Sequence, residues 1–199
     1  PPDKDSFYVA LSTSNILTRD STIAEFISSE LLPENGYQRV NVNFGVDGIY
    51  NSVENRFELP AINPSFTASG ASLQFQSAFL IADGKPFSSL ELSPVNISSG
   101  ENLITFTAHP FVDGDKVVFS ADETSSLPSG INSLQVYTVS EATPDSFKID
   151  STIAGNGSGT FYIRSANGNI VAATIEDSPI TVFDGQQYTY QIPIKSLSF

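Results

Sequence analysis

Histidine is the side chain best suited to proton transfer near neutral pH, and this chain contains one, His109. A single histidine cannot supply the cluster of ligands that a zinc site needs. The sequence has no G-x-S-x-G nucleophile motif, so its many serines do not define a Ser-His-Asp triad. We interpret His109, which precedes Pro110, as a loop residue that hydrogen-bonds a turn, and we predict no catalytic residue.

Paired carboxylates are the second arrangement that could carry chemistry. They occur at Asp3/Asp5, Asp113/Asp115, Asp122/Glu123 and Glu176/Asp177. A glycosidase needs two carboxylates across a cleft, and no feature of the sequence places a pair in one. Asp113-Gly114-Asp115 offers oxygen ligands for calcium, but the rest of the calcium-loop pattern is absent. We favour a plain β-turn there, and we predict no metal and no cofactor.

Two further motifs have both a binding and a structural interpretation. Tyr188 and Tyr190 are two residues apart on an expected strand, so they share a face. Aromatic platforms for sugars have this spacing, but so do cross-strand pairs and buried cores, which we favour. Gly155–Gly159 is as rich in glycine as a phosphate-binding loop. It lacks the lysine and the following helix, so we interpret it as a hairpin tip.

One helix is expected, over residues 22–32. Thr22 and Glu25 have the spacing of a capping box, and Pro33 with Asn35-Gly36 ends the pattern. Between these signals one apolar stripe follows the helical period, formed by Ile23, Phe26, Ile27 and Leu31. This amphipathic pattern predicts that the helix lies on one face or edge of a sheet.

Strand patterns dominate the rest of the chain and predict an all-β protein, mainly an antiparallel sandwich or barrel. They cover 7–11, 40–44, 53–59, 71–82, 103–107, 116–120, 134–139, 146–150, 159–164, 170–175, 180–183 and 188–194. Five short strands in the region from about 88 to 164 predict a small β-barrel or sandwich module over 89–163. We predict that this module is inserted at a surface turn of a host β domain, made of 1–88 and 164–199 with an extended arm at 1–6.

The charge balance of the sequence limits the classes of partner that we expect. The net charge is −13, and the nine Lys and Arg residues never cluster. Such a chain repels phosphate backbones and anionic lipid, so we expect no nucleic acid and no membrane as a partner. Charged residues make up only 16% of the sequence, and Ser, Thr, Asn and Gln fill the expected surface, which suits broad hydrogen-bonded protein contacts. The absence of cysteine excludes a disulfide framework.

Several short motifs stand out in both parts of the chain. The host part contains FYVALSTSNILT at 7–18, GYQR at 36–39, FLIADG at 79–84 and a final strand at 184–192. Together these motifs resemble those of small virion proteins of tailed bacteriophages. The inserted part resembles a module of phage tail, fibre and capsid-associated proteins through GDKVVF at 114–119, LPSGI at 127–131, VYTV at 136–139 and TPDSFKI at 143–149. This resemblance implies a structural protein and carries no catalytic residues.

We therefore predict a non-enzymatic capsid decoration or cement protein on the outer surface of the phage particle. Its expected partners are the major capsid protein and copies of itself, with a trimer as one arrangement. The expected contact arm is Pro1, Pro2, Asp3, Lys4, Asp5 and Ser6, and the expected exposed module tips are Leu127, Pro128, Ser129, Gly130, Asn156 and Gly157. A tail or fibre-associated adhesin for a host glycan or protein is the alternative. A polysaccharide-degrading enzyme that uses a carboxylate pair is the third hypothesis.

Overall fold

The computed structural model confirms the all-β prediction. It describes residues 7–18, 21–43, 62–86 and 88–190, together with the backbone of two short strands at 49–51 and 56–58. Strand makes up 45% of the chain, about twice the usual share, and nearly all of it is antiparallel. The chain contacts divide into two compact units: unit 1 contains 1–20, 30–86 and 168–199, and unit 2 contains 21–29 and 87–167. The domain limits predicted above stay a prediction.

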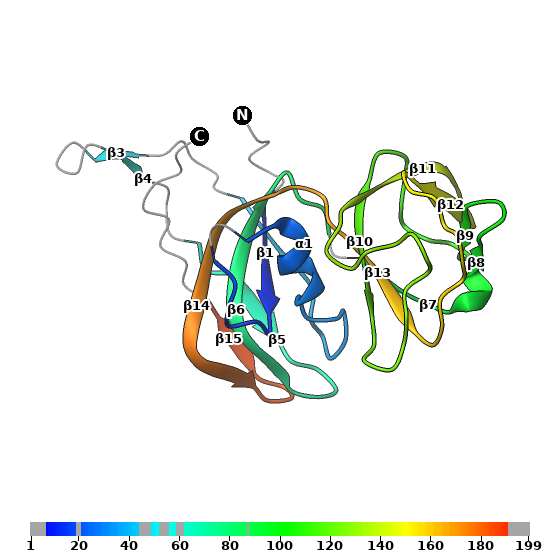
Figure 1. Ribbon diagram of the computed structural model, residues 1–199. Coiled ribbons are helices and arrows are strands. Elements are labelled where there is room, and N and C mark those ends of the chain that lie inside the picture. Colours follow the sequence, from blue (N-terminus) through cyan, green and yellow to red (C-terminus); the bar gives the residue numbers. More distant parts are fainter. Residues whose placement is uncertain are drawn as a thin grey trace. The chain divides into compact units, whose positions relative to one another are not determined.

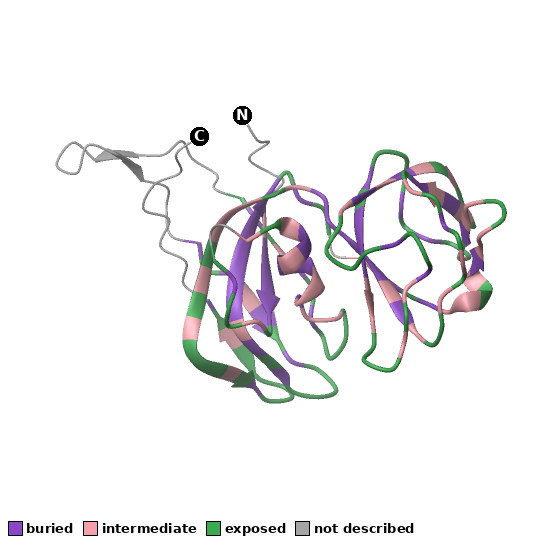
Figure 2. Cartoon of the chain, in the orientation of Figure 1, coloured by how far each residue is buried: buried purple, intermediate pink, exposed green. Residues whose placement is uncertain are grey.

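Unit 1 is built on a four-stranded antiparallel sheet with the order β14-β6-β1-β2. Its strands are β1 (Phe7–Ser12), β2 (Val40–Val42), β6 (Leu73–Ala82) and β14 (Asn169–Val182). Two small antiparallel pairs accompany it: β5 (Ser65–Thr67) with β15 (Gln187–Thr189), and β3 (Ile49–Asn51) with β4 (Arg56–Glu58). Strand β6 lies between β1 and β14, and both β1 and β6 are almost entirely buried (Figures 1 and 2).

The central position of β6 follows from its sequence. The run Phe79–Ala82 is continuously apolar and fully buried, as expected for a strand that is covered on both faces. Leu80 is opposite Val9 of β1 and opposite Ala172 of β14, so β6 contributes hydrogen bonds to a strand on each side. Phe75, earlier in β6, packs edge-on against Tyr188 with ring centroids 5.5 Å apart. The small β5–β15 pair therefore covers one face of this sheet.

Unit 2 is a seven-stranded antiparallel sheet with the order β7-β13-β10-β11-β12-β9-β8. Its strands are β7 (Ser89–Leu92), β8 (Ile97–Ser98), β9 (Leu103–Thr105), β10 (Lys116–Ala121), β11 (Tyr137–Thr143), β12 (Ser146–Ile149) and β13 (Phe161–Ser165). The two edge strands, β7 and β8, are consecutive in the chain and are joined by one 3-10 turn, Pro94–Asn96. The sheet therefore curls until its edges approach each other, and it encloses an apolar core that includes Val117, Phe119, Tyr137, Phe147 and Phe161.

The predicted helix is present but shorter than 22–32. It is α1, Ile23–Ser28, and the expected capping box forms: the Glu25 amide donates to Thr22 Oγ1 and the Thr22 amide donates to Glu25 Oε2. The helix ends early because Glu30 forms a β-bridge with Ser12, which draws the chain back toward β1. Phe26 and Ile27 are buried, as the apolar stripe predicted, whereas Leu31 lies beyond the helix and is half-buried.

An arginine that is distant in the sequence donates hydrogen bonds to the last carbonyl groups of this helix. The guanidinium Nη1 of Arg164, on β13, donates to the carbonyl oxygens of Ile27 at 3.0 Å and Ser28 at 2.9 Å. The last carbonyls of a helix have no partner within it, and the helix dipole favours a cation beside them. The last turn of α1 has no basic residue of its own, so Arg164 supplies that charge and ties α1 to the unit 2 sheet.

Candidate functional site

His109 is held within the core of unit 2 and is 8% exposed. Its Nδ1 accepts a hydrogen bond from the Phe111 amide, so its proton is on Nε2, which donates to the carbonyl oxygen of Ser146 at 3.1 Å. The rings of Phe111 and Phe147 pack against the imidazole, with the Phe147 centroid 4.8 Å away. Both ring nitrogens therefore stabilise the backbone of this loop, in agreement with the turn interpretation.

The Asp113-Gly114-Asp115 segment is a turn between the His109 loop and β10. Asp113 Oδ1 accepts from the Ala142 amide at 2.8 Å, and Asp115 Oδ2 accepts from the Val112 amide at 3.0 Å. Each carboxylate thus satisfies a backbone donor. Within the described ranges, no group of three or more His, Cys, Asp or Glu side chains is placed to hold a metal ion.

Tyr190 belongs to the core of unit 1, and Tyr188 is half-buried beside it. Both rings pack against Phe75, and Tyr190 is 4% exposed. The Tyr190 hydroxyl donates to the carboxylate of Glu176 on β14, and burial together with this bond raises the pKa of Tyr190. Burial and the Glu176 charge also raise the pKa of Tyr188. The pair thus follows the core interpretation, and it also holds Glu176 in place.

The two predicted module tips lie side by side. The Ser126 and Ser158 backbones exchange two hydrogen bonds of 3.0 Å each, their hydroxyls are 2.9 Å apart, and the Ala154 amide donates to the Ser129 carbonyl at 2.8 Å. We call the segments 125–131 and 151–160 the loop pair. Nothing in the sequence indicated this pairing, because the two segments are distant along the chain.

Two glycines allow the loop pair to close. Gly157 has φ +75°, and a Cβ on it would be 2.6 Å from the Ser126 carbonyl oxygen. Gly130 has φ +97°, and a Cβ there would overlap the Thr152 carbonyl oxygen. Only glycine combines a left-handed backbone with such a close approach, so the loop pair is fixed by backbone geometry.

The predicted exposure of the tips needs one correction. Ser129, Gly130 and Asn156 are exposed, and Gly157 is half-buried. The prediction of an exposed tip is wrong for Pro128, which is buried, and Leu127 is half-buried because it packs against the core of unit 2. The apolar side chains of the LPSGI motif therefore anchor the loop to the core. The predicted contact arm, Pro1–Ser6, lies outside the described residues.

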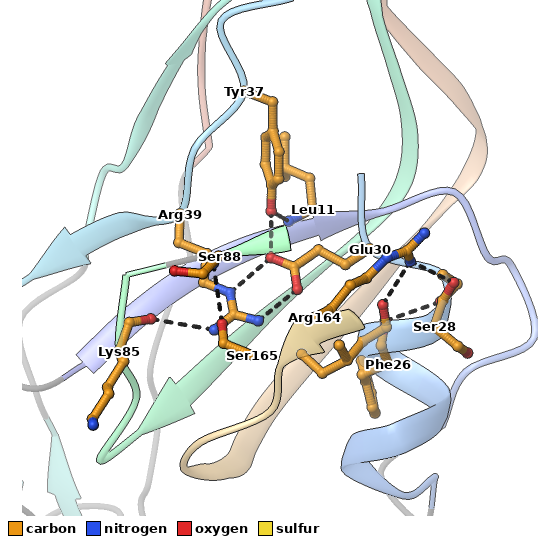
Figure 3. A network of polar contacts seen from close by, with 12 residues as sticks. Leu11, Phe26, Ser28, Glu30, Tyr37, Arg39, Lys85, Ser88, Arg164 and Ser165 are labelled. Carbon is orange, nitrogen blue, oxygen red and sulfur yellow. Dashed lines mark hydrogen bonds and ion pairs between the residues drawn. The ribbon is translucent and has the colours of Figure 1, made fainter. Parts of the chain in front are cut away.

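Unit 1 contains a buried ionic network that the sequence did not indicate (Figure 3). The Glu30 carboxylate accepts two hydrogen bonds of 2.7 Å from the Arg39 guanidinium, and a third of 2.8 Å from the Tyr37 hydroxyl. The side chains of Glu30 and Arg39 are both 0% exposed. Tyr37 also accepts from the Leu11 amide of β1, and Arg39 donates to the Lys85 carbonyl. The network thus connects four segments of unit 1 around one carboxylate.

This environment changes the acidity of two members of the network. Burial, and then the negative charge of Glu30, raise the pKa of Tyr37 well above its usual value. Burial by itself would lower the pKa of Arg39, but the Glu30 carboxylate outweighs it and raises that pKa. The phenol therefore stays neutral and the guanidinium stays charged in the folded protein.

The Tyr37 phenol should make unit 1 less stable in alkali. A group whose pKa is raised by folding contributes stability that is complete below its unfolded pKa, about 10 for tyrosine, and lost as the pH rises above it. Above about pH 10, the free energy of unfolding should fall less steeply with pH for Tyr37→Phe than for the natural chain. We expect the two slopes to differ by up to ~1.4 kcal/mol per pH unit. Urea unfolding at several pH values measures this slope. Tyr188 and Tyr190 remain in both proteins, and equal slopes would contradict the prediction.

An open hollow of about 410 Å³ lies beside β2. Its polar lining consists of three amides and one hydroxyl, from Asn41, Asn43, Asn63 and Ser65. Its apolar lining comes from Val40, Val42, Ile62 and Pro64. An uncharged lining of this kind favours hydrogen bonds to neutral groups such as a peptide backbone or sugar hydroxyls. None of these eight lining residues, which all lie in the described part of the chain, is titratable.

Comparison with known proteins yields no assignment: no protein-family model matches the chain, and no curated protein matches it in sequence. Among the described residues, no helix has the length and apolar character needed to cross a bilayer.

Proposed function

We propose that this chain is a non-enzymatic structural protein of a tailed-phage particle, and that it binds the outside of the head as a decoration protein. The observation that carries the proposal is the loop pair. Its two segments are hydrogen-bonded to each other and carry no charged residue, on a protein whose net charge is −13. The resemblance of several motifs to phage virion proteins gives this surface its context.

The loop pair has the properties of a protein-binding surface. No charged residue occurs between Asp122–Glu123 and Glu141, or between Asp150 and Arg164. Backbone hydrogen bonds hold the two segments together before any partner arrives, so little conformational entropy is lost on binding. The exposed groups are hydroxyls, an amide and backbone, which suits hydrogen bonding over a broad contact.

Three of the polar residues that could have contributed to a reactive site are hydrogen-bonded to the backbone instead. His109 uses both ring nitrogens for backbone groups, and Asp113 and Asp115 each accept a backbone amide. A general base must reach the proton that it removes, and His109 is buried with both ring nitrogens engaged by backbone groups. This use of the side chains favours a structural role over a polysaccharide-degrading one.

Binding to phage particles that lack this protein tests the proposal. We expect the purified full chain to co-sediment with such particles at on the order of hundreds of copies each, as repeated capsid positions require. The particles should then regain resistance to heat and osmotic shock. The double variant Ser129→Glu, Asn156→Glu should bind at least about tenfold more weakly, because it places charge on the loop pair.

A matched double variant provides the control. Asn15→Glu with Ser72→Glu adds the same charge at exposed positions of unit 1 and should bind as the natural chain does. Binding of only about ten copies, with loss of host adsorption when the protein is absent, would indicate the tail-associated adhesin. Absence of binding, or equal weakening in both double variants, would overturn the decoration proposal.

A further inference from the structure

The sequence contains three Asn-Gly pairs, at Asn35-Gly36, Asn156-Gly157 and Asn167-Gly168. The side-chain carbon Cγ of an asparagine can be attacked by the backbone nitrogen of the next residue. Glycine has no side chain to obstruct this approach, and it leaves the backbone most free to turn toward the carboxamide. Each pair is therefore a candidate site of deamidation, and the fold decides which of them reacts.

The carboxamide of Asn167 is bound and shielded from water. Asn167 is 9% exposed, and its Oδ1 accepts a hydrogen bond from the Lys116 amide at 2.9 Å. Its Nδ2, which would have to leave as ammonia, is buried. Deamidation at this pair therefore requires local opening of unit 2.

The Asn35-Gly36 pair is held by its backbone. Asn35 has φ +52°, and its carbonyl oxygen accepts a hydrogen bond from the Ser69 amide at 2.8 Å. The Tyr37 amide closes the same turn on the Glu34 carbonyl at 2.9 Å. The peptide group between Asn35 and Gly36 can turn toward the carboxamide only if the bond to Ser69 breaks.

The Asn156-Gly157 pair has none of these restraints. Asn156 is exposed, and within the described part of the chain its carboxamide, its carbonyl oxygen and the Gly157 amide have no hydrogen-bond partner. Gly155 precedes Asn156, so neither neighbour in the chain covers the carboxamide with a side chain.

The hydrogen bonds of the loop pair lie on both sides of this tip and leave it unbonded. They are made by the backbones of Ala154 and Ser158, whereas the peptide group between Asn156 and Gly157 makes none within the described residues. Turning that peptide group toward the carboxamide changes φ of Gly157 without moving its Cα, and glycine tolerates such a change. The close packing of Gly157 therefore does not oppose the attack.

We propose that Asn156 is a site of spontaneous deamidation in the folded protein. The Gly157 nitrogen loses its proton and attacks Asn156 Cγ, so that a new N–Cγ bond closes a succinimide ring. The bond from Cγ to Nδ2 breaks, and ammonia leaves with the proton. Water then opens the ring. Cleavage of the new N–Cγ bond gives aspartate, and cleavage of the bond between that nitrogen and the main-chain carbonyl carbon gives isoaspartate.

Either product places a carboxylate on the loop pair, which has no charged residue of its own, and changes the net charge from −13 to −14. Isoaspartate also lengthens the backbone by one carbon atom between the hydrogen bonds at Ala154 and Ser158. The modified chain should therefore bind the particle more weakly, for the same reason as the glutamate variant of the loop pair. This effect on binding rests on the proposed function, whereas the deamidation itself does not.

Peptide mapping by mass spectrometry tests the inference on the full chain, sampled over time in mildly alkaline buffer. We expect aspartate and isoaspartate to form at Asn156 at least about tenfold faster than at Asn35 or Asn167, because each of those pairs must first break a hydrogen bond of the fold. In urea the three pairs should react at similar rates, since these bonds are then lost. An unchanged Asn156, or equal rates at the three pairs in the folded chain, would overturn the inference.

Two variants test the chemical route. Asn156→Gln keeps a carboxamide on a longer side chain, which would have to close a larger and less favourable ring, so the modification at this position should disappear. Asn15→Gln is the matched control, at an exposed asparagine that no glycine follows, and it should leave the rate at Asn156 unchanged. An Asn156→Gln protein that is modified at this position as fast as the natural chain would refute the succinimide route.

Binding to particles that lack this protein measures the consequence. The natural chain and Asn15→Gln should lose binding in step with deamidation at Asn156, whereas the binding of Asn156→Gln should not change with time relative to its own fresh sample. A fully modified chain that binds as tightly as the fresh chain would refute the effect on binding. A fresh chain that does not bind particles would refute the proposed function, and the deamidation measured by mass would still stand.

Discussion

Replacing Arg39 by methionine should lower the free energy of unfolding of unit 1 by about 3–5 kcal/mol, because it leaves the Glu30 carboxylate buried without its cation. In the folded protein Arg39 gives this carboxylate two hydrogen bonds of 2.7 Å, and neither side chain has any exposed surface. The Tyr37 hydroxyl would remain as a neutral donor to the carboxylate. Urea unfolding monitored by circular dichroism gives the difference in free energy.

A double variant separates the cost of an unpaired charge from the value of the ion pair. Glu30→Gln with Arg39→Met removes both charges and should be more stable than Arg39→Met alone, because no buried ion is then left without a partner. If the double variant lost the sum of the two single effects, the buried charge would not be the cause. An Arg39→Met protein as stable as the natural chain would refute the prediction.

Truncating Phe119 to alanine should destabilise unit 2 by about 3–5 kcal/mol, through lost burial and the cavity that remains. Phe119 lies on β10, at 0% exposure, and packs edge-on against Tyr137 with ring centroids 5.6 Å apart. Its strand pairs with β11 and β13, so the surrounding sheet has little freedom to collapse into the space. Thermal and urea unfolding of the variant measure the loss.

Leu134→Ala is the matched control, since Leu134 is 59% exposed in the same unit. Its effect should stay within about 0.5 kcal/mol. The pair Arg39→Met and Phe119→Ala also tests the two-unit organisation. If the units unfold separately, each variant shifts one of two transitions. A single transition that moves equally in both variants would contradict separate unfolding.

Patterns within a few residues determined the local elements. The Thr22–Glu25 capping box predicted the start of α1, because both of its hydrogen bonds join residues three apart. The apolar run in β6 predicted a central strand, since only a strand covered on both faces buries every position. In unit 2 the turns at 113–115 and 143–145 placed β10 and β12 correctly, because turn chemistry is also local.

Contacts between residues that are distant in the sequence decided the element limits and strands that local patterns did not predict. Helix α1 ends at Ser28 because of the bridge between Ser12 and Glu30, which no pattern around residue 28 shows. Strands β7 and β8 were not predicted, since each is short and gains its order from the closing sheet. The predicted strands 170–175 and 180–183 are one strand, β14, because β6 continues through the irregular interval.

The features of the candidate surfaces also fall into those that the sequence determined and those that only the tertiary structure decided. The composition of the sequence determined that 125–131 and 155–158 are uncharged turn segments that contain glycine. Only the tertiary structure decided that these segments pair, that Pro128 is buried, that Glu30 meets Arg39, and that the first half of β14 lies at an edge. The physical reason is that turn geometry and capping depend on neighbours along the chain. Burial, ion pairing and edge position depend instead on which distant strands the folded backbone brings together.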